Sequence, residues 1–424
     1  MPLQSVRSAA QPDPTSLAAR FAAIRSATQG LAAPLSAEDC ALQSMPDASP
    51  VKWHLAHTTW FFETFVLERF GRDYRPFDRS FRVLFNPYYN GVGDKHPRSE
   101  RGLVSRPDLA TVRAYRAHVE RAMQALLHDP PEAAASLIEL GLNHEQQHQE
   151  LILTDVLHLF SRNPAWPAYR TRVPVAAAQA EALTWRRFDG GLVSVGHDGD
   201  GFAFDNEAPR HRVFLAPFEL ASRPVTNAEF ADFIADGGYG RPELWLSIGW
   251  DTVVARGWQA PLFWQRDGKR WRQFTLHGMT DIDVDAPVCH VSFLEAEAYA
   301  RWAGARLPTE FEWEHVAAAQ PIEGNFADSG VLRPLPQRSA MQMFGDVWEW
   351  TRSEYAPYPG FRVAPGAVGE YNGKFMCGQY VLRGGSCATP RSHIRATYRN
   401  FFPPDARWQF SGLRLARDIA HAAA

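Results

Sequence analysis

The chain has 424 residues, 45% of them apolar and 21% charged, and its formal net charge at pH 7 is -3. This length predicts two or three domains with ample core. The near-neutral charge argues against a nucleic-acid partner, and no apolar run approaches the roughly 18 residues that a membrane span needs.

The N-terminus and the cysteines indicate the cellular compartment of the protein. Residues 1–14 are polar and contain proline, which predicts a flexible tail in place of a signal peptide. The four cysteines form no C-x-x-C pair. We therefore expect a protein of the reducing cytoplasm, without a disulfide framework.

The first part of the chain has the pattern of long helices. An apolar stripe follows a Ser/Thr cap from Leu17 to Gly30, and Val51 to Phe70 is apolar nearly all round, as in a buried helix. Two more helices are predicted from Asp108 to His128 and from Pro131 to Phe160. Long helices with one extended crossover indicate a four-helix bundle, which we place at residues 15–162.

The crossover from Gly71 to Pro107 is too long to be a simple connection. Loops of that length in compact domains are functional or disordered, and the aromatic residues of this one argue against disorder. It carries the pair Tyr88 and Tyr89 and several arginines, among them Arg98 and Arg101. The tyrosines could be simple packing or proton donors, and the arginines could be solvated or could bind a carboxylate.

The composition changes at about Trp185. Before it, residues 163–184 are rich in proline and form a predicted linker. After it, strands are short, glycine and tryptophan are frequent, and long stretches such as Asp236 to Asp285 look irregular. One clear helix is expected from Ser292 to Ala303. We predict an α+β domain of low regular content over residues 185–420.

Two histidines in the last bundle helix form a candidate metal site. His144 and His148 are four residues apart, so both imidazoles project from one helix face and can hold one divalent metal. A solvated histidine pair is the alternative. A third ligand is available from His57 or His54 on the buried helix, and spacing alone does not choose between them. Three neutral imidazoles suit Fe, Zn or Cu.

The same stretch also satisfies H-E-x-x-H, the zinc peptidase motif, with Glu145 as general base. That reading needs a third zinc ligand soon after the motif. No glycine and histidine follow at the required spacing, and there is no glutamate between Leu151 and Ala180. The sequence therefore disfavours a zinc hydrolase.

The chain resembles the ergothioneine-type sulfoxide synthases, including the related selenoneine synthases. These non-haem iron enzymes join a DinB-like four-helix bundle to a C-type-lectin-like FGE-sulfatase domain. The bundle carries the matching runs Trp53–His57 and His144–Glu150, the latter being the family's H-x-x-x-H-x-E. The second domain carries matching runs at Glu207–Val213, Pro224–Phe230, Arg306–Glu314, Gly345–Trp350 and Arg383–Ser386.

The resemblance implies an enzyme that binds Fe(II) through His57, His144 and His148. The family couples a thiol to the imidazole C2 of hercynine (Nα-trimethylhistidine) with O2, giving a sulfoxide. Gln147 and Asn400 match positions that contact hercynine.

Further roles follow from the same resemblance. Phe401 and Phe402 would hold the trimethylammonium group by cation–π contact. The family branch with a Tyr-Tyr pair makes Tyr88 and Tyr89 the candidate proton donors. Arg98 and Arg101 would hold the carboxylate of the sulfur donor.

Two departures from the family pattern guide the choice of donor and of catalytic domain. The γ-glutamylcysteine branch of the family has an acidic residue after the aromatic residue, and the run Arg399–Arg407 lacks it. This departure favours free cysteine as the sulfur donor. A selenosugar, as in selenoneine synthesis, is the alternative donor. Thr389 and Ile394 stand where formylglycine-generating enzymes carry copper-binding cysteines. The second domain is thus expected to be a pocket wall. A non-catalytic FGE-like binding module is the remaining rival.

Overall fold

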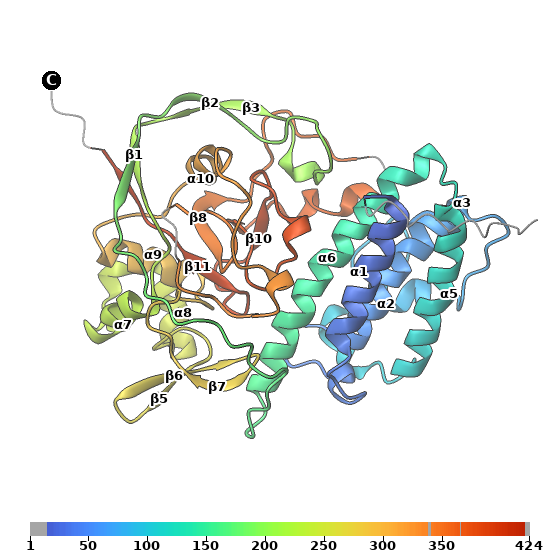
Figure 1. Cartoon of the computed structure of the whole chain (residues 1–424), viewed down its shortest axis with the longest axis horizontal. Coiled ribbons are helices and arrows are strands. Elements are labelled where there is room, and N and C mark those ends of the chain that lie inside the picture. Colours follow the sequence, from blue (N-terminus) through green and yellow to red (C-terminus); the bar gives the residue numbers. More distant parts are fainter. Residues whose placement is uncertain (1–14, 338–340, 365, 420–424) are drawn as a thin grey trace, which may run out of the picture.

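The computed structural model describes residues 15–337, 341–364 and 366–419. A helical bundle packs beside a larger domain of short strands, helices and loops (Figure 1). The predicted tail, residues 1–14, and residue 420, the last of the predicted second domain, lie outside the described residues. In the part of the chain described, no helix combines the length and apolar character needed to cross a membrane.

The four predicted helices form the bundle, and side-chain caps begin two of them. They are α1 (Leu17–Ala32), α2 (Val51–Phe61), α5 (Leu109–Leu127) and α6 (Glu132–Ser161). Ser16 Oγ accepts a hydrogen bond from the backbone N–H of Ala19, and Asp108 accepts one from that of Thr111. Helix α6 packs against α1 and α2, and α2 also packs against α5.

The helix predicted over Val51–Phe70 is continuous but changes its pitch. Helix α2 passes into a π-helical segment, Phe62–Leu67, and ends as α3, Glu68–Phe70. The wide turn carries Glu63, whose buried carboxylate accepts hydrogen bonds from Tyr74 and Tyr115. These bonds satisfy a carboxylate that would otherwise be costly to bury.

The long crossover is ordered, as its aromatic content suggested. It contains the one-turn helix α4 (Phe81–Leu84) and the 3-10 helix η3 (Arg98–Leu103). The buried side chain of Asn86 accepts from the N–H of Tyr89 and donates to its carbonyl oxygen. Gln43, beyond the 3-10 helix η1 (Asp39–Ala41), donates to the carbonyl oxygen of Arg98 and accepts from the N–H of Gly102. The crossover is thereby held against the bundle.

The second domain is built from small sheets. Its strands are β1 (Trp185–Phe188), β2 (Gly191–Val195), β3 (His211–Leu215), β4 (Phe218–Ala221), β5 (Trp264–Asp267), β6 (Arg270–Thr275), β7 (Gly278–Asp281), β8 (Trp348–Glu354), β9 (Tyr380–Arg383), β10 (Asn400–Phe402), β11 (Ser411–Leu413) and β12 (Ala416–Asp418). They pair in the orders β1-β4-β12, β10-β9-β8-β11, β2-β3 and β5-β6-β7. Strand β10, which carries Asn400, pairs antiparallel with β9.

Four helices accompany these sheets: α7 (Asn227–Ala235), α8 (Ser247–Arg256), α9 (Phe293–Trp302) and α10 (Glu310–Ala317). Capping boxes open three of them, at Thr226, Ser292 and Thr309. The helix expected from Ser292 is confirmed. The irregular stretch expected at Asp236–Asp285 is wrong, because it contains α8 and the whole sheet β5-β6-β7.

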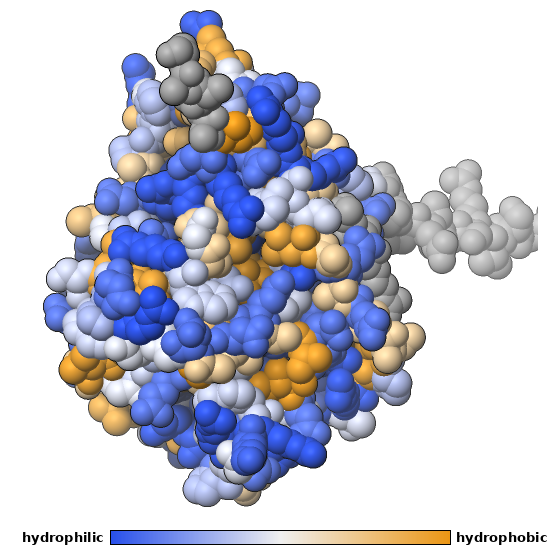
Figure 2. Space-filling model, turned by 90° about the vertical axis from the view of Figure 1, so that its left-hand side faces the viewer, coloured by the Kyte–Doolittle hydropathy of each residue, from blue (hydrophilic) through white to orange (hydrophobic). Residues whose placement is uncertain are grey.

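The surface of the second domain that faces away from the bundle is mostly hydrophilic. Figure 2 shows this face, where hydrophobic residues lie in separate small groups among hydrophilic ones. The apolar side chains of both domains instead join in one buried core cluster, which includes Trp60 of α2 and Trp348 of β8. The two domains therefore pack as one body.

Polar residues on one face of α6 join the bundle to the second domain. They are Asn143, Gln146, Gln147 and Glu150, spaced at intervals of three and four residues. Asn143 contacts His393, and Gln146 donates to Ser392. Helix α6 thus has one face toward α2 and another toward the second domain.

Candidate metal centre and substrate cavity

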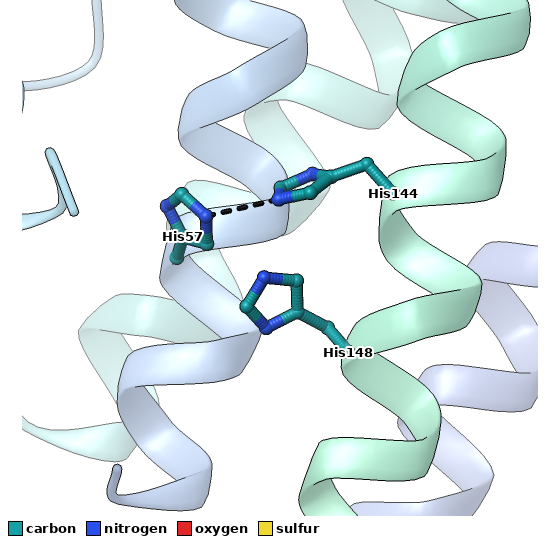
Figure 3. A group of neighbouring side chains, drawn as sticks. All are labelled: His57, His144 and His148. Atoms are coloured by element: carbon teal, nitrogen blue, oxygen red, sulfur yellow. Dashed lines mark hydrogen bonds between the residues drawn. The ribbon is translucent and has the colours of Figure 1, made fainter. Parts of the chain in front are cut away.

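Three histidines converge between α2 and α6. A ligand nitrogen from each of His57, His144 and His148 lies within 4.8 Å of the other two, and all three side chains are buried. Figure 3 shows His57 on α2 facing His144 and His148 on α6. His57, and not His54, completes the group that the i, i+4 pair begins.

Hydrogen bonds orient two of the three rings. His57 Nδ1 lies 2.8 Å from the carbonyl oxygen of Phe85, so it carries the proton and leaves Nε2 free. That Nε2 faces His144 Nε2 at 3.1 Å. His148 Nδ1 contacts His54 Nδ1 at 2.8 Å, which directs the other nitrogen of His148 toward the group. Such outer hydrogen bonds are typical of metal-binding histidines.

Burial keeps these imidazoles neutral. It lowers the pKa of His144 to about 3, and it lowers the pKa of His57 and His148 well below the ordinary value, with help from the neighbouring histidines. A metal binds only the deprotonated ring nitrogen, so no proton competes for these positions at neutral pH. Three neutral nitrogen donors aimed at one point fit a mononuclear Fe, Zn or Cu ion.

Glu145 is not placed to act as the general base of a zinc peptidase. Its fully buried carboxylate pairs with Arg25 at 2.9 Å and with Arg116 at 3.1 Å. Burial alone would raise the pKa of Glu145, but the two guanidinium charges outweigh it and lower the pKa to about 2. The residue stabilises the bundle interior, and H-E-x-x-H is here a coincidence of sequence.

A cavity of about 430 Å³ opens beside the histidines, between the bundle and the second domain. Both domains line it. The lining includes ten of the eleven residues predicted for the site: His57, Tyr88, Arg98, Arg101, His144, Gln147, His148, Asn400, Phe401 and Phe402. Tyr89 is the exception.

The tyrosine pair consists of a partly buried ring, Tyr88, and a fully buried ring, Tyr89. Tyr88 borders the cavity, and Tyr89 is fully buried with its ring centre 4.7 Å from that of Tyr88. Burial raises the pKa of both phenols, so both remain protonated at neutral pH. Of the two tyrosines, only Tyr88 lines the cavity.

The two arginines form a basic end of the cavity. The Arg101 guanidinium stacks 3.5 Å from the ring centre of Trp53 and donates from Nη1 to Ser49 Oγ at 2.9 Å. Its buried Nε has no hydrogen-bond partner among the described residues. Burial, aided by the charge of Arg98, lowers the pKa of Arg101 to about 9, which still leaves it charged at neutral pH. Arg98 donates to the carbonyl oxygen of Asp47.

Residues from the second domain complete the cavity, and sequence reasoning missed several of them. Gln147 donates to the hydroxyl of Tyr398 at 2.7 Å and accepts from that of Tyr371. The Tyr371 ring centre is 5.7 Å from that of His144, and the ring stacks on Phe204. No motif marks these residues, since they come from loops and one-turn helices.

The segment around β10 shapes the outer end of the cavity. Phe401 stacks on Tyr355 with ring centres 4.0 Å apart. The two charged residues that follow turn away from the cavity: Asp405 pairs with Arg256 at 2.6 Å, and Arg407 pairs with Glu295 at 2.8 Å. Asp405 and Arg407 are therefore absent from the cavity lining, whereas Phe401 and Phe402 belong to it.

The chain matches two known domain families. Residues 20–152 match the DinB superfamily, and residues 175–340 and 337–419 match the sulfatase-modifying factor enzyme 1-like domain, called FGE-sulfatase. A helical bundle and an FGE-sulfatase domain that together enclose a three-histidine cavity define the class, a two-domain protein with a candidate metal centre between its domains.

Full-length relatives identify the family. The chain is 37% identical to a hercynine oxygenase of Mycobacterium tuberculosis, over 96% of this chain and 99% of that protein. It is also 37% identical to a hercynine oxygenase of Mycolicibacterium smegmatis, over 89% and 93%. Ergothioneine biosynthesis protein 1 of Schizosaccharomyces pombe is 28% identical over 51% of this chain and 28% of that protein. The chain belongs to the hercynine oxygenase family, the ergothioneine-type sulfoxide synthases, which confirms the predicted family and fold class.

Proposed function

We propose that this enzyme uses Fe(II) and O2 to join a sulfur donor to the imidazole C2 of hercynine, giving a hercynyl sulfoxide. One observation carries the proposal: three buried, neutral histidines meet at a cavity large enough for small-molecule substrates, in a chain 37% identical to hercynine oxygenases over nearly its full length.

His57, His144 and His148 would hold the iron. Three protein nitrogens leave coordination positions open for ligands. When bound, Fe(II) supplies the activation of O2 and a point at which both substrates are brought together. The protein contributes buried ligands that need not lose protons before binding.

The second domain, together with Gln147 of α6, would position hercynine. Asn400 and Gln147 offer amide groups for its carboxylate and imidazole, and both border the cavity. The trimethylammonium group needs aromatic faces, which Phe401 and Phe402 provide. Because β10 is fixed by pairing to β9, these contacts would orient the imidazole without a large loss of side-chain freedom.

The bundle and its crossover would position the sulfur donor and supply a proton. Arg98 and Arg101 carry the positive charge for a carboxylate at one end of the cavity. The hydroxyl of Tyr88, kept protonated by burial, can donate its proton to a developing negative charge beside the reacting atoms. Tyr89 would act behind it, by packing against its ring.

Free cysteine is the donor we favour. A γ-glutamyl arm would need charged partners near Phe402, but Asp405 and Arg407 are already paired with Arg256 and Glu295 outside the cavity lining. A selenosugar is the second candidate. The aromatic side chains of Phe402 and Trp408 and the amides of Gln379 and Gln409 line the cavity, and such a wall suits a neutral polar donor.

The test is anaerobic loading with Fe(II), followed by O2 and hercynine with cysteine, γ-glutamylcysteine or a selenosugar in parallel, with products identified by mass. Hercynyl-cysteine sulfoxide is the expected product, and His148→Ala serves as the metal-free control. Selenium transfer without sulfur transfer would replace the donor assignment. No consumption of hercynine with any donor would refute the proposed function.

A further inference from the structure

His54 lies outside the three-histidine group yet contacts one of its members. His54 Nδ1 is 2.8 Å from His148 Nδ1, and His54 Nε2 is 3.0 Å from Asp155 Oδ2. The same carboxylate oxygen accepts from the backbone N–H of Ser49 at 2.8 Å. His54, Asp155 and Ser49 are 2%, 6% and 5% exposed, so these bonds are largely shielded from bulk solvent.

The direction of each hydrogen bond follows from the chemistry of its atoms. A carboxylate oxygen accepts, so His54 donates to Asp155 through Nε2. In its singly protonated form His54 carries this N–H on Nε2, so its Nδ1 then accepts. The proton between the two rings therefore belongs to His148 Nδ1. That leaves His148 Nε2 with a free lone pair on the side of His57 and His144.

We propose that Asp155 and His54 form a hydrogen-bond relay that fixes the tautomer and ring orientation of His148 and so strengthens metal binding. His54 and Asp155 are thus positioning residues. The inference rests on the proposed metal site. It also explains why the bundle helix carries two histidines one turn apart: His57 faces the metal position directly, and His54 acts through His148.

The three ligands differ in this support. His57 obtains it from the carbonyl oxygen of Phe85. His144 Nδ1 is buried and has no hydrogen-bond partner among the described residues. His148 alone is held by a side chain that is itself held by a carboxylate, an arrangement that raises ligand basicity. Metal binding by His148 should therefore depend more on a neighbouring side chain than metal binding by His57 or His144.

Two substitutions of His54 separate a relay from simple packing. In His54→Asn the amide oxygen lies close to the position of Nδ1 and can accept from His148, but the side chain is too short for Asp155. In His54→Gln the amide reaches the position of Nε2 and Asp155, but offers nothing to His148. The asparagine and glutamine side chains are similar in polarity, so a purely space-filling role of His54 predicts similar metal affinities for the two variants.

The measurement is the affinity for Fe(II), and for Co(II) as a spectroscopic probe, by competition with a chelator in the absence of O2. Outer hydrogen bonds to metal ligands are worth roughly 10- to 100-fold in affinity. We expect His54→Gln to bind about 10- to 100-fold more weakly than the parent, with an altered Co(II) absorption spectrum, and His54→Asn to stay within about threefold. Equal affinities of the two variants would overturn the relay.

Controls separate failure of the relay from failure of the metal site. His148→Ala should lose the high-affinity site, and full retention of metal there would refute the ligand assignment itself. Ser49→Ala removes the contact to Arg101 but keeps the backbone N–H that Asp155 accepts, so its metal affinity should equal that of the parent. If His54→Gln does not fold, Asp155→Leu provides the second test, because it removes the acceptor from His54 Nε2. An unchanged metal affinity of Asp155→Leu would equally overturn the relay.

Discussion

Glu150 offers a sharp test of how the two domains are joined. Its buried carboxylate accepts hydrogen bonds from Trp348 Nε1 at 2.7 Å, Ser386 Oγ at 2.6 Å and Thr389 Oγ1 at 2.9 Å. All three donors belong to the second domain, whereas Glu150 lies on α6, two residues beyond His148. The substitution Glu150→Ala removes every one of these bonds.

The expected cost can be worked from the donors that are left behind. Trp348 is 1% exposed, so its N–H would lose its acceptor without gaining water, at about 1–3 kcal/mol. Ser386 and Thr389 lie 3.1 Å apart and can form a hydrogen bond with each other, so they add less to the loss of unfolding free energy than Trp348 does. With the lost packing of the side chain, we expect a decrease of about 3 kcal/mol in the free energy of unfolding.

Glu150→Gln is the matched comparison. The amide oxygen can accept from Trp348 and Ser386, and the Thr389 hydroxyl can turn to accept from the amide nitrogen. Burial raises the pKa of Glu150, although its three donors oppose that effect, so a neutral side chain is well tolerated. The free energy of unfolding of Glu150→Gln should stay within about 1 kcal/mol of the parent value.

Urea unfolding of the metal-free protein, followed by tryptophan fluorescence and circular dichroism, measures both variants. Glu139→Ala controls for the loss of a carboxylate from α6, because Glu139 is partly exposed, pairs with Arg20 and should cost less than about 1 kcal/mol. If Glu150→Ala proves no more destabilising than Glu139→Ala, the reasoning about the interdomain bonds is refuted.

Three further predictions concern the site. Tyr88→Phe should slow coupling by roughly 100-fold or more without changing the affinity for iron. Tyr89→Phe should slow coupling less, because only Tyr88 of the pair borders the cavity. Equal rates for the two variants in single-turnover assays would contradict this prediction. Arg101→Lys should raise the KM for the sulfur donor roughly tenfold, because lysine loses the stacking on Trp53 and the planar donors, while an unchanged KM would argue against a carboxylate contact. The metal-free protein should lose stability as pH falls below about 6.5, because unfolded histidines take up protons there and His144, with its pKa near 3, does not. His148→Asn should reduce that slope by about 1.4 kcal/mol per pH unit, and an unchanged slope would mean that His148 is not held neutral.

The sequence predicted the bundle and its histidines because helical periodicity is a local property. His144 and His148 share a face by virtue of their spacing, and the apolar surroundings of Val51–Phe70 indicate burial wherever the helix packs. The choice between His54 and His57 is different. It depends on the rotation of α2 against α6, which no short-range pattern encodes.

The sheet at β5-β6-β7 was missed although a signal was present. Gly268-Lys269 is the two-residue loop between β5 and β6, and Gly268 adopts the positive φ that glycine provides at the first loop position. Short strands rich in arginine and tryptophan hid the alternation that usually accompanies such a turn. Tyr371 and Tyr398 had no local signal, since they meet Gln147 only through long-range packing.

Helix α6 explains why the second domain accompanies a bundle that already contains the three histidines. One face of α6 presents His144 and His148 toward α2, and the face with Asn143, Gln147 and Glu150 is bonded to the second domain. The contacts that fix the second domain are therefore interleaved, residue by residue, with those that fix the metal position. A shift of the second domain would move α6 and widen the group of nitrogens, besides opening the cavity wall. Substrate positioning and metal geometry thus depend on the same interface, and substitutions there should affect both together.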